Sequence, residues 1–138
     1  MKKELSRNDF LKVHDAATLL TQNLGKHITI PELSIMVQLP EYKLKTGFMQ
    51  LFGKGIYEYQ TNIRLEKVKE MLLEDFPIKG IALTIGYKDK GSLIKAFRNK
   101  FGVTPGNWKK QHAYGFNVDT VLNSFISEPG NNAKLNNP

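Results

Sequence analysis

The spacing of apolar residues predicts helices through most of the chain. Between residues 9 and 24, Phe10, Val13 and Leu20 recur with a helical period, and Gly25 then favours a helix end. A second helical pattern runs from about residue 29 to Gly53, a third from Ile56 to about residue 74, and a fourth from residue 77 to Gly102. A short final turn is expected around residue 108. The chain is therefore expected to be all-α.

Part of this pattern occurs twice. A set of apolar, aromatic and glycine positions reappears with a constant offset of 49 residues: Leu44, Phe48, Phe52, Gly53 and Tyr59 correspond to Leu93, Phe97, Phe101, Gly102 and Trp108. A short apolar helix and a turn precede each copy. This arrangement predicts two helix-turn-helix units, at residues 29–53 and 77–102.

The start and the buried face of the first unit follow from its sequence. Thr29 and Glu32 have the spacing of a capping box, and Pro31 is tolerated so early in a helix. Pro40 ends the turn and begins the next helix. The side chains expected to be buried in these two helices are Leu33, Met36, Val37, Leu44, Phe48, Leu51 and Phe52.

A long linker helix is predicted at residues 56–74, between the two units. At about 1.5 Å per residue it is roughly 28 Å long, close to the pitch of one turn of B-DNA, about 34 Å. Its expected buried stripe consists of Ile56, Tyr59, Ile63, Val68 and Leu72, flanked by Leu65 and Met71. Such a helix can hold two DNA-reading units one helical turn apart.

In each unit, the second helix has a face opposite its apolar side that carries short and basic side chains. These side chains are Tyr42, Lys43, Lys45, Thr46 and Met49 in the first unit, and Lys90, Gly91, Ile94, Lys95 and Arg98 in the second. Lysine can donate to guanine in the major groove, and isoleucine can contact a thymine methyl group. A merely solvated lysine face would explain one such helix, but its repetition favours recognition of DNA.

The charge of the chain agrees with a polyanionic partner. The net charge is +7. Residues 112–138 contain only one Lys, one Asp and one Glu, so the positive excess lies in the first 111 residues.

The chain has no cysteine, no apolar run of about 20 residues and no signal-peptide core. We therefore expect a cytoplasmic protein with no membrane partner and no disulfide bond.

The sequence offers little for an enzyme. His14, His27 and His112 share no metal-ligand spacing. There is no G-x-S-x-G motif and no P-loop, and the Gly53-Lys54-Gly55 segment follows a helix rather than a strand. We expect no catalytic activity, no metal and no cofactor.

The second unit contains a long motif, Gly86-Tyr87-x-Asp89-x-x-Ser92-Leu93-x-x-x-Phe97-x-x-x-Phe101-Gly102-x-Thr104-Pro105-x-x-Trp108-Lys109. This motif resembles the signature of AraC/XylS-type transcriptional regulators, and Arg64-Leu65 resembles part of that family's linker helix. The resemblance covers roughly residues 9–110. It implies an all-helical DNA-binding module of two homeodomain-like helix-turn-helix units.

The resemblance also implies which side chains contact DNA. By motif position, base contacts are expected from Tyr42, Lys45 and Thr46 in the first unit and from Lys90, Gly91, Ile94 and Lys95 in the second. We expect phosphate contacts from Lys43, Lys88 and Arg98. These positions coincide with the exposed faces inferred from the helical spacing.

The sequence thus predicts a DNA-binding domain at residues 8–111 and a tail at 112–138, with a short helix near Val118–Ile126 followed by a disordered end. The expected function is regulation of transcription by sequence-specific binding to double-stranded DNA. Two alternatives stay open: an interaction module that contacts RNA polymerase or another regulator, and a non-specific DNA binder. The chain acts either alone or as a C-terminal piece that follows an effector or dimerisation domain.

Overall fold

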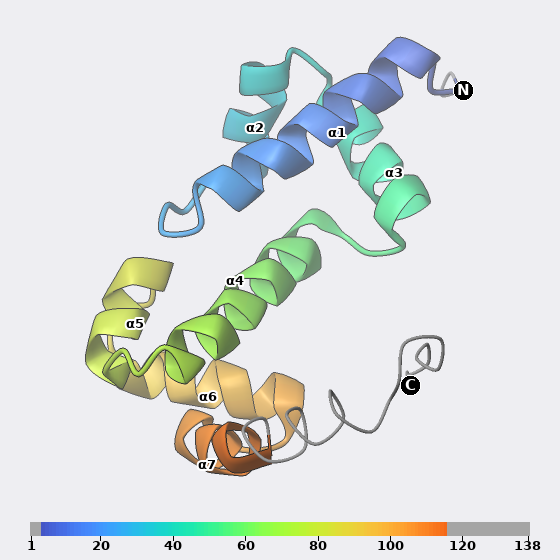
Figure 1. Ribbon diagram of the computed structural model, residues 1–138. Coiled ribbons are helices and arrows are strands. Elements are labelled where there is room, and N and C mark those ends of the chain that lie inside the picture. Colours follow the sequence, from blue (N-terminus) through green and yellow to red (C-terminus); the bar gives the residue numbers. More distant parts are fainter. Residues whose placement is uncertain (1–3, 116–138) are drawn as a thin grey trace, which may run out of the picture.

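The computed structural model describes residues 4–115 of the chain, and within this range all regular structure is helical. Figure 1 shows α4 running between two groups of helices, α1–α3 and α5–α7. The helices are α1 (Arg7–Gln22), α2 (Ile30–Val37), α3 (Glu41–Phe52), α4 (Ile56–Leu73), α5 (Ile78–Ile85), α6 (Lys90–Phe101) and α7 (Pro105–Gly115). The expected all-α arrangement of two helix-turn-helix units joined by a long helix is confirmed.

Side-chain caps determine where the first two helices begin. The Thr29 hydroxyl accepts from the backbone N–H of Glu32 at 3.3 Å, and the Glu32 carboxylate accepts from the backbone N–H of Thr29 at 2.8 Å. The predicted capping box is therefore present. Ser6 and Asp9 form a second box at α1, which the apolar spacing did not reveal. As a result α1 begins at Arg7 rather than at Asp9, and it ends two residues before the expected Leu24.

The first hydrophobic core lies between α1, α2 and α3 and extends to the start of α4. Val13, Leu20, Leu33, Leu44 and Phe48 are completely buried in it. The rings of Phe48, Phe52 and Tyr59 contact one another, with centroids 4.8–5.4 Å apart. These aromatic contacts attach the beginning of α4 to the first unit.

Two residues expected in this core are exposed. Met36 is 50 % exposed and Leu51 is 45 % exposed. The helix α3 packs closely on α1 at Gly47, which is buried directly against Val13 and leaves no room for a Cβ. Leu51 lies on the same side of α3 as Gly47 but in the last turn of the helix, which ends at Phe52, one turn beyond this close contact with α1.

The second core joins the end of α4 to α5, α6 and α7. Leu65, Ile81, Leu93 and Phe97 are completely buried there. The ring of Trp108 lies edge-on to that of Phe97, with centroids 6.2 Å apart. The second unit therefore has its own core, which depends on α7 as well as on its two helix-turn-helix helices.

The buried face of α4 changes along its length. Ile56, Tyr59 and Ile63 pack on the first core, whereas Leu65, Val68, Met71 and Leu72 belong to the second. The single predicted stripe is therefore wrong: Leu65 and Met71 are core residues rather than flanking ones. Each half of the helix serves one core, because the two units pack on different sides of it.

The last helix is longer than the predicted short turn around Trp108. It continues through Gly115, so residues 112–115, which we assigned to the tail, belong to α7. The expected helix near Val118–Ile126 lies outside the described residues. Within residues 4–115, no helix combines the length and hydropathy needed to cross a bilayer.

Candidate nucleic-acid interface

The second helices of the two units, α3 and α6, are anchored by equivalent apolar residues. Leu44 and Phe48 of α3 are fully buried, as are Leu93 and Phe97 of α6. Because these residues hold one side of each helix against its own core, the opposite side is left for a partner. This is the arrangement that a recognition helix requires.

In α3, the structure exposes two of the three residues expected to contact bases. Lys45 is exposed, Tyr42 is 36 % exposed, and Thr46 is half-buried. The three residues lie in the first two turns of α3, which starts at Glu41. A recognition helix presents this N-terminal part to base edges.

Lys43 is not on the open face where we expected it. Its ammonium lies 3.0 Å from the Asp9 carboxylate of α1, and both side chains are largely buried. Hydrogen bonds from the Ser6 backbone and from Lys43 hold the pKa of Asp9 below its ordinary value. The Lys43 charge is therefore already neutralised within the protein. The spacing of apolar residues in the sequence could not reveal this ion pair, because Asp9 and Lys43 are 34 residues apart.

In α6, Lys90, Gly91 and Lys95 are exposed, while Ile94 is half-buried beside them. A Cβ built on Gly91 would lie 3.5 Å from an Asp89 carboxylate oxygen, which is an ordinary contact distance. Local packing thus does not require glycine at this position. The missing side chain instead leaves the backbone of the first turn of α6 open to a partner.

The basic side chains of these faces are available for a polyanion. The ion pairs found in residues 4–115 join Lys43 to Asp9, Lys67 to Glu70, Lys69 to Glu66 and Lys109 to Asp75. None of the other predicted contact lysines takes part in them. Lys88 and Arg98, expected at phosphates, are both exposed.

The start of α6 is fixed by Asp89. Its carboxylate accepts from the backbone N–H of Ser92 at 2.8 Å and so caps the helix. This hydrogen bond is the main reason why the pKa of Asp89 lies below its ordinary value. The same carboxylate orients the first turn of α6, which carries Lys90 and Gly91.

Acid should therefore weaken the fold, and Asp89 should contribute to this loss. A lowered folded-state pKa means that the stabilisation is complete above the unfolded pKa and disappears as the pH falls through the folded one. We expect the melting temperature to decline below about pH 4. Asp89→Asn keeps an N-cap without a titrating group, so its decline should be shallower than that of the wild type. Identical pH profiles would contradict this role of Asp89.

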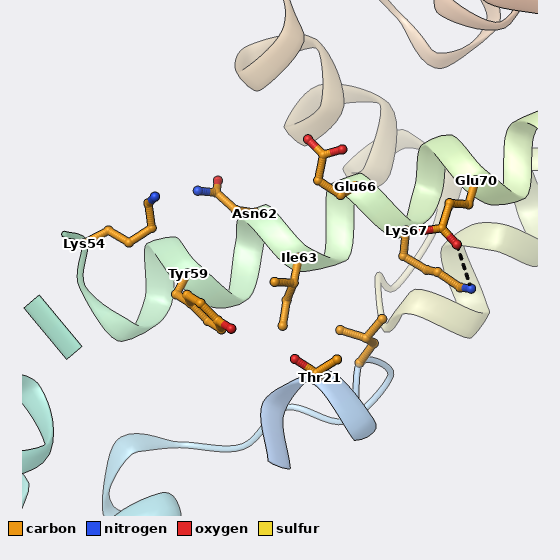
Figure 2. Close-up of a pocket in the computed structure, with 9 residues that line it drawn as sticks. Thr21, Lys54, Tyr59, Asn62, Ile63, Glu66, Lys67 and Glu70 are labelled. Atoms are coloured by element: carbon orange, nitrogen blue, oxygen red, sulfur yellow. Dashed lines mark hydrogen bonds and ion pairs between the residues drawn. The ribbon is translucent and has the colours of Figure 1, made fainter. Parts of the chain in front are cut away.

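A groove of about 560 Å³ lies between the end of α1 and α4. Figure 2 shows Thr21 facing the α4 residues Tyr59 and Ile63 across it, with the Lys67–Glu70 ion pair at one end. Its charged residues are of both signs. Within residues 4–115, no three His, Cys, Asp or Glu side chains are grouped so that they could hold a metal ion.

Comparison with known proteins identifies the module. A family described as "Helix-turn-helix domain" matches residues 33–111, more than half of the chain. The HTH-type transcriptional regulator ArgR of Pseudomonas aeruginosa is 27 % identical over 112 residues, which are 80 % of this chain and 34 % of ArgR. A transcriptional regulator with an AraC-type DNA-binding domain, from Chromobacterium violaceum, superposes with a TM-score of 0.69 and 22 % identity, covering 78 % of this chain and 97 % of that one.

The chain belongs to the AraC-type helix-turn-helix family. It is a DNA-binding domain of the kind found in transcriptional regulators. The DNA-binding domain of AdpA, solved in complex with a target DNA, has a similar fold, with a TM-score of 0.66, 16 % identity and coverage of 75 % and 94 % of the two chains. The chain spans about a third of the length of most of the curated relatives that it matches, and 12 % of the regulator YtdP of Bacillus subtilis.

Membership in the AraC-type family accounts for the double helix-turn-helix and for α7. The family match ends at residue 111, within α7, whose Trp108 is part of the second core. Arg64 of α4 belongs to the segment that resembles the linker helix of this family. In the structure, the guanidinium of Arg64 donates to backbone carbonyls of the loop after α1.

Proposed function

We propose that this AraC-type domain binds double-stranded DNA sequence-specifically, with α3 and α6 in two successive segments of the major groove. The observation that carries the proposal is the pair of equivalent helices, each anchored by two buried apolar residues: α3 exposes Lys45, and α6 exposes Lys90 and Lys95. The axis of α4, 18 residues long, measures about 27 Å. This length is comparable to the repeat of about 34 Å between successive groove windows.

The exposed side chains suit base recognition. Lys45, Lys90 and Lys95 can donate to guanine O6 and N7, and the Thr46 hydroxyl can donate to or accept from several bases. Ile94 offers an apolar surface to a thymine methyl group. Lys88 and Arg98 would bind phosphates, which position the domain but carry no sequence information. We no longer assign a phosphate to Lys43, since its ammonium is paired with Asp9.

Regulation of transcription follows from this binding. We propose that the domain works in the cytoplasm, where bacterial DNA is accessible, and that contacts with RNA polymerase or with an additional effector or dimerisation domain turn DNA binding into control of a promoter. ArgR, of which the matched segment is only 34 %, supports a role for additional domains. The alternative is non-specific DNA binding, which the experiment below distinguishes from sequence-specific binding.

The test is selection of bound duplexes from a random DNA pool at about 0.15 M salt, the physiological ionic strength. Two enriched motifs, separated by about one helical turn or 10 base pairs, are expected if both helices read bases. Uniform recovery of all sequences would identify a non-specific binder. Failure to retain any duplex, with a normal circular dichroism spectrum, would contradict DNA binding and favour an interaction module.

A further inference from the structure

The two units, taken as the helix groups α1–α3 and α5–α7, touch each other directly, in addition to sharing α4. The loop that follows α1 reaches the C-terminal end of α5 (Figure 1). A Cβ built on Gly25 of this loop would lie 2.6 Å from the backbone oxygen of Thr84, and one built on Gly86 would lie 2.9 Å from the oxygen of Gly25. Neither glycine can carry a side chain unless the backbones of the two units move apart.

Arg64 holds the same loop from the side of α4. Its Nε donates to the carbonyl of Leu24 at 3.0 Å, and one terminal nitrogen donates to the carbonyl of Lys26 at 3.1 Å. The two acceptors flank Gly25. Hydrogen bonds from a charged donor are stronger than those between neutral groups. Arg64 thus fixes the loop residue that contacts α5.

The position of Arg64 in α4 gives this contact its importance. Ile63, one residue earlier, packs on the first core, and Leu65, one residue later, is buried in the second. The loop, α4 and the end of α5 therefore meet where α4 passes from one unit to the other. We call the backbone approach of Gly25 to Thr84 and Gly86, together with the two hydrogen bonds of Arg64, the interunit contact.

We propose that the interunit contact sets the orientation of α3 relative to α6, and so determines which spacing of two half-sites the domain accepts. This inference rests on the proposed reading of DNA by both helices. Once the first of two linked units is bound to DNA, the second is held close to its own half-site. Its effective concentration there is high only if the linkage lets both units bind their half-sites at the same time. A fixed orientation favours one spacing and disfavours the others. Arg64 acts here as a positioning residue, since it does not itself need to touch DNA.

The first part of the test needs no DNA. Because the chain has no native cysteine, spin labels can be attached to cysteines introduced at Gln50 and Asn99, equivalent exposed positions of α3 and α6. We expect a narrow label-to-label distance distribution in the otherwise unchanged protein. Arg64→Ala and Gly25→Ala should broaden or shift it, and Arg64→Lys, which keeps one donor group, should restore part of the narrow component.

Gly106→Ala is the matched control. A Cβ on Gly106 would have no neighbour within 4 Å, so this substitution adds the same methyl group without disturbing the interunit contact. Its distance distribution should equal that of the wild type. Should Arg64→Ala fail to fold, Gly25→Ala decides the matter. An unchanged distribution in the folded variants would overturn the proposal, whether or not the domain binds DNA.

The second part measures affinity for the selected duplex, for each half-site alone, and for duplexes in which the spacing is changed in steps of one base pair. At the preferred spacing, Arg64→Ala and Gly25→Ala should bind about tenfold more weakly, a part of the 10²–10⁴-fold gain that linkage can provide. Their half-site affinities should stay within about twofold of wild type, and their dependence on spacing should flatten. An equal loss for half-sites and full sites would contradict the positioning role. Failure of the wild type to prefer the selected duplex over unrelated DNA would instead contradict the proposed function, while the distance measurement still tests the contact.

Discussion

Replacing Phe97 by alanine should lower the free energy of unfolding by about 3–5 kcal/mol, the usual cost of deleting a buried aromatic ring. Phe97 is completely buried, and its ring contacts those of Phe101 and Trp108, with centroids 4.6 and 6.2 Å away. Removal of the ring leaves a cavity between α6 and α7 that the rigid helices cannot close. The total stability of a domain is only about 5–15 kcal/mol, so the second unit should be severely weakened.

The single tryptophan makes this loss measurable in one unit. Trp108 is the only tryptophan of the chain and belongs to the second core. Its fluorescence should therefore report unfolding of the second unit, while circular dichroism reports both. Phe48→Ala, the equivalent change in the first core, should shift the dichroism transition more than the fluorescence transition. Phe76→Ala, at a ring that is 48 % exposed, is the surface control. A Phe97→Ala protein that melts like this control would refute the described core.

The second large effect concerns DNA. Replacing Lys45 or Lys95 by alanine should weaken binding to the selected site by about 1–3 kcal/mol, or roughly 5- to 150-fold, if each lysine donates to a base. Both lysines are exposed, and Lys95 lies on the side of α6 opposite the buried Phe97. Truncation removes a donor and leaves the guanine acceptors of the site unpaired.

Base contacts and phosphate contacts can be distinguished by measuring how each variant changes the preference for each base pair of the site. Loss of a base contact should relax specificity at one position, whereas loss of a phosphate contact weakens all sequences alike. Lys110→Ala removes the same charge from an exposed position of α7 and should produce only the second kind of effect. Lys45→Ala and Lys95→Ala proteins with wild-type affinity and unchanged base preference would exclude both lysines from the interface.

The sequence was sufficient for the repeated features of this fold. The 49-residue offset relates Phe48 to Phe97, and both are completely buried. A local rule located the start of α2 as well, as the cap by Thr29 shows. Such features depend on neighbours within a few residues, or on a period that the chain displays twice, and so they can be read without knowing the tertiary structure.

The errors arose where distant elements meet. Leu51 was predicted to be buried, but α3 packs on α1 at Gly47, and Leu51, one turn further along in the last turn of α3, is 45 % exposed. Lys43 was expected to face a phosphate, but Asp9 of α1 lies within 3.0 Å of it. In the same way, a helical period cannot show that α4 changes its buried face. These outcomes depend on how helices pack on one another, which spacing within a single helix does not specify.

The predicted contact residues for DNA stay predictions. The structure locates Lys45, Lys90 and Lys95 on exposed surfaces, which is the condition for a contact rather than the contact itself. Arg64 was visible in the sequence only as part of a motif. Its hydrogen bonds to carbonyls 38 and 40 residues away depend on the fold, and no local sequence pattern predicts them.

The division of α4 between two cores also restricts how such a protein can change over evolutionary time. One inserted or deleted residue in the middle of this helix would rotate everything beyond it by about 100° and shift it by about 1.5 Å. The second half of α4 would then present the wrong side chains to the second core, and Gly86 would leave Gly25. Substitutions can accumulate in α4, but insertion or deletion of a single residue would disrupt the second core. Descendants of this chain should therefore conserve the number of residues between Ile56 and Leu73 more strictly than their identities.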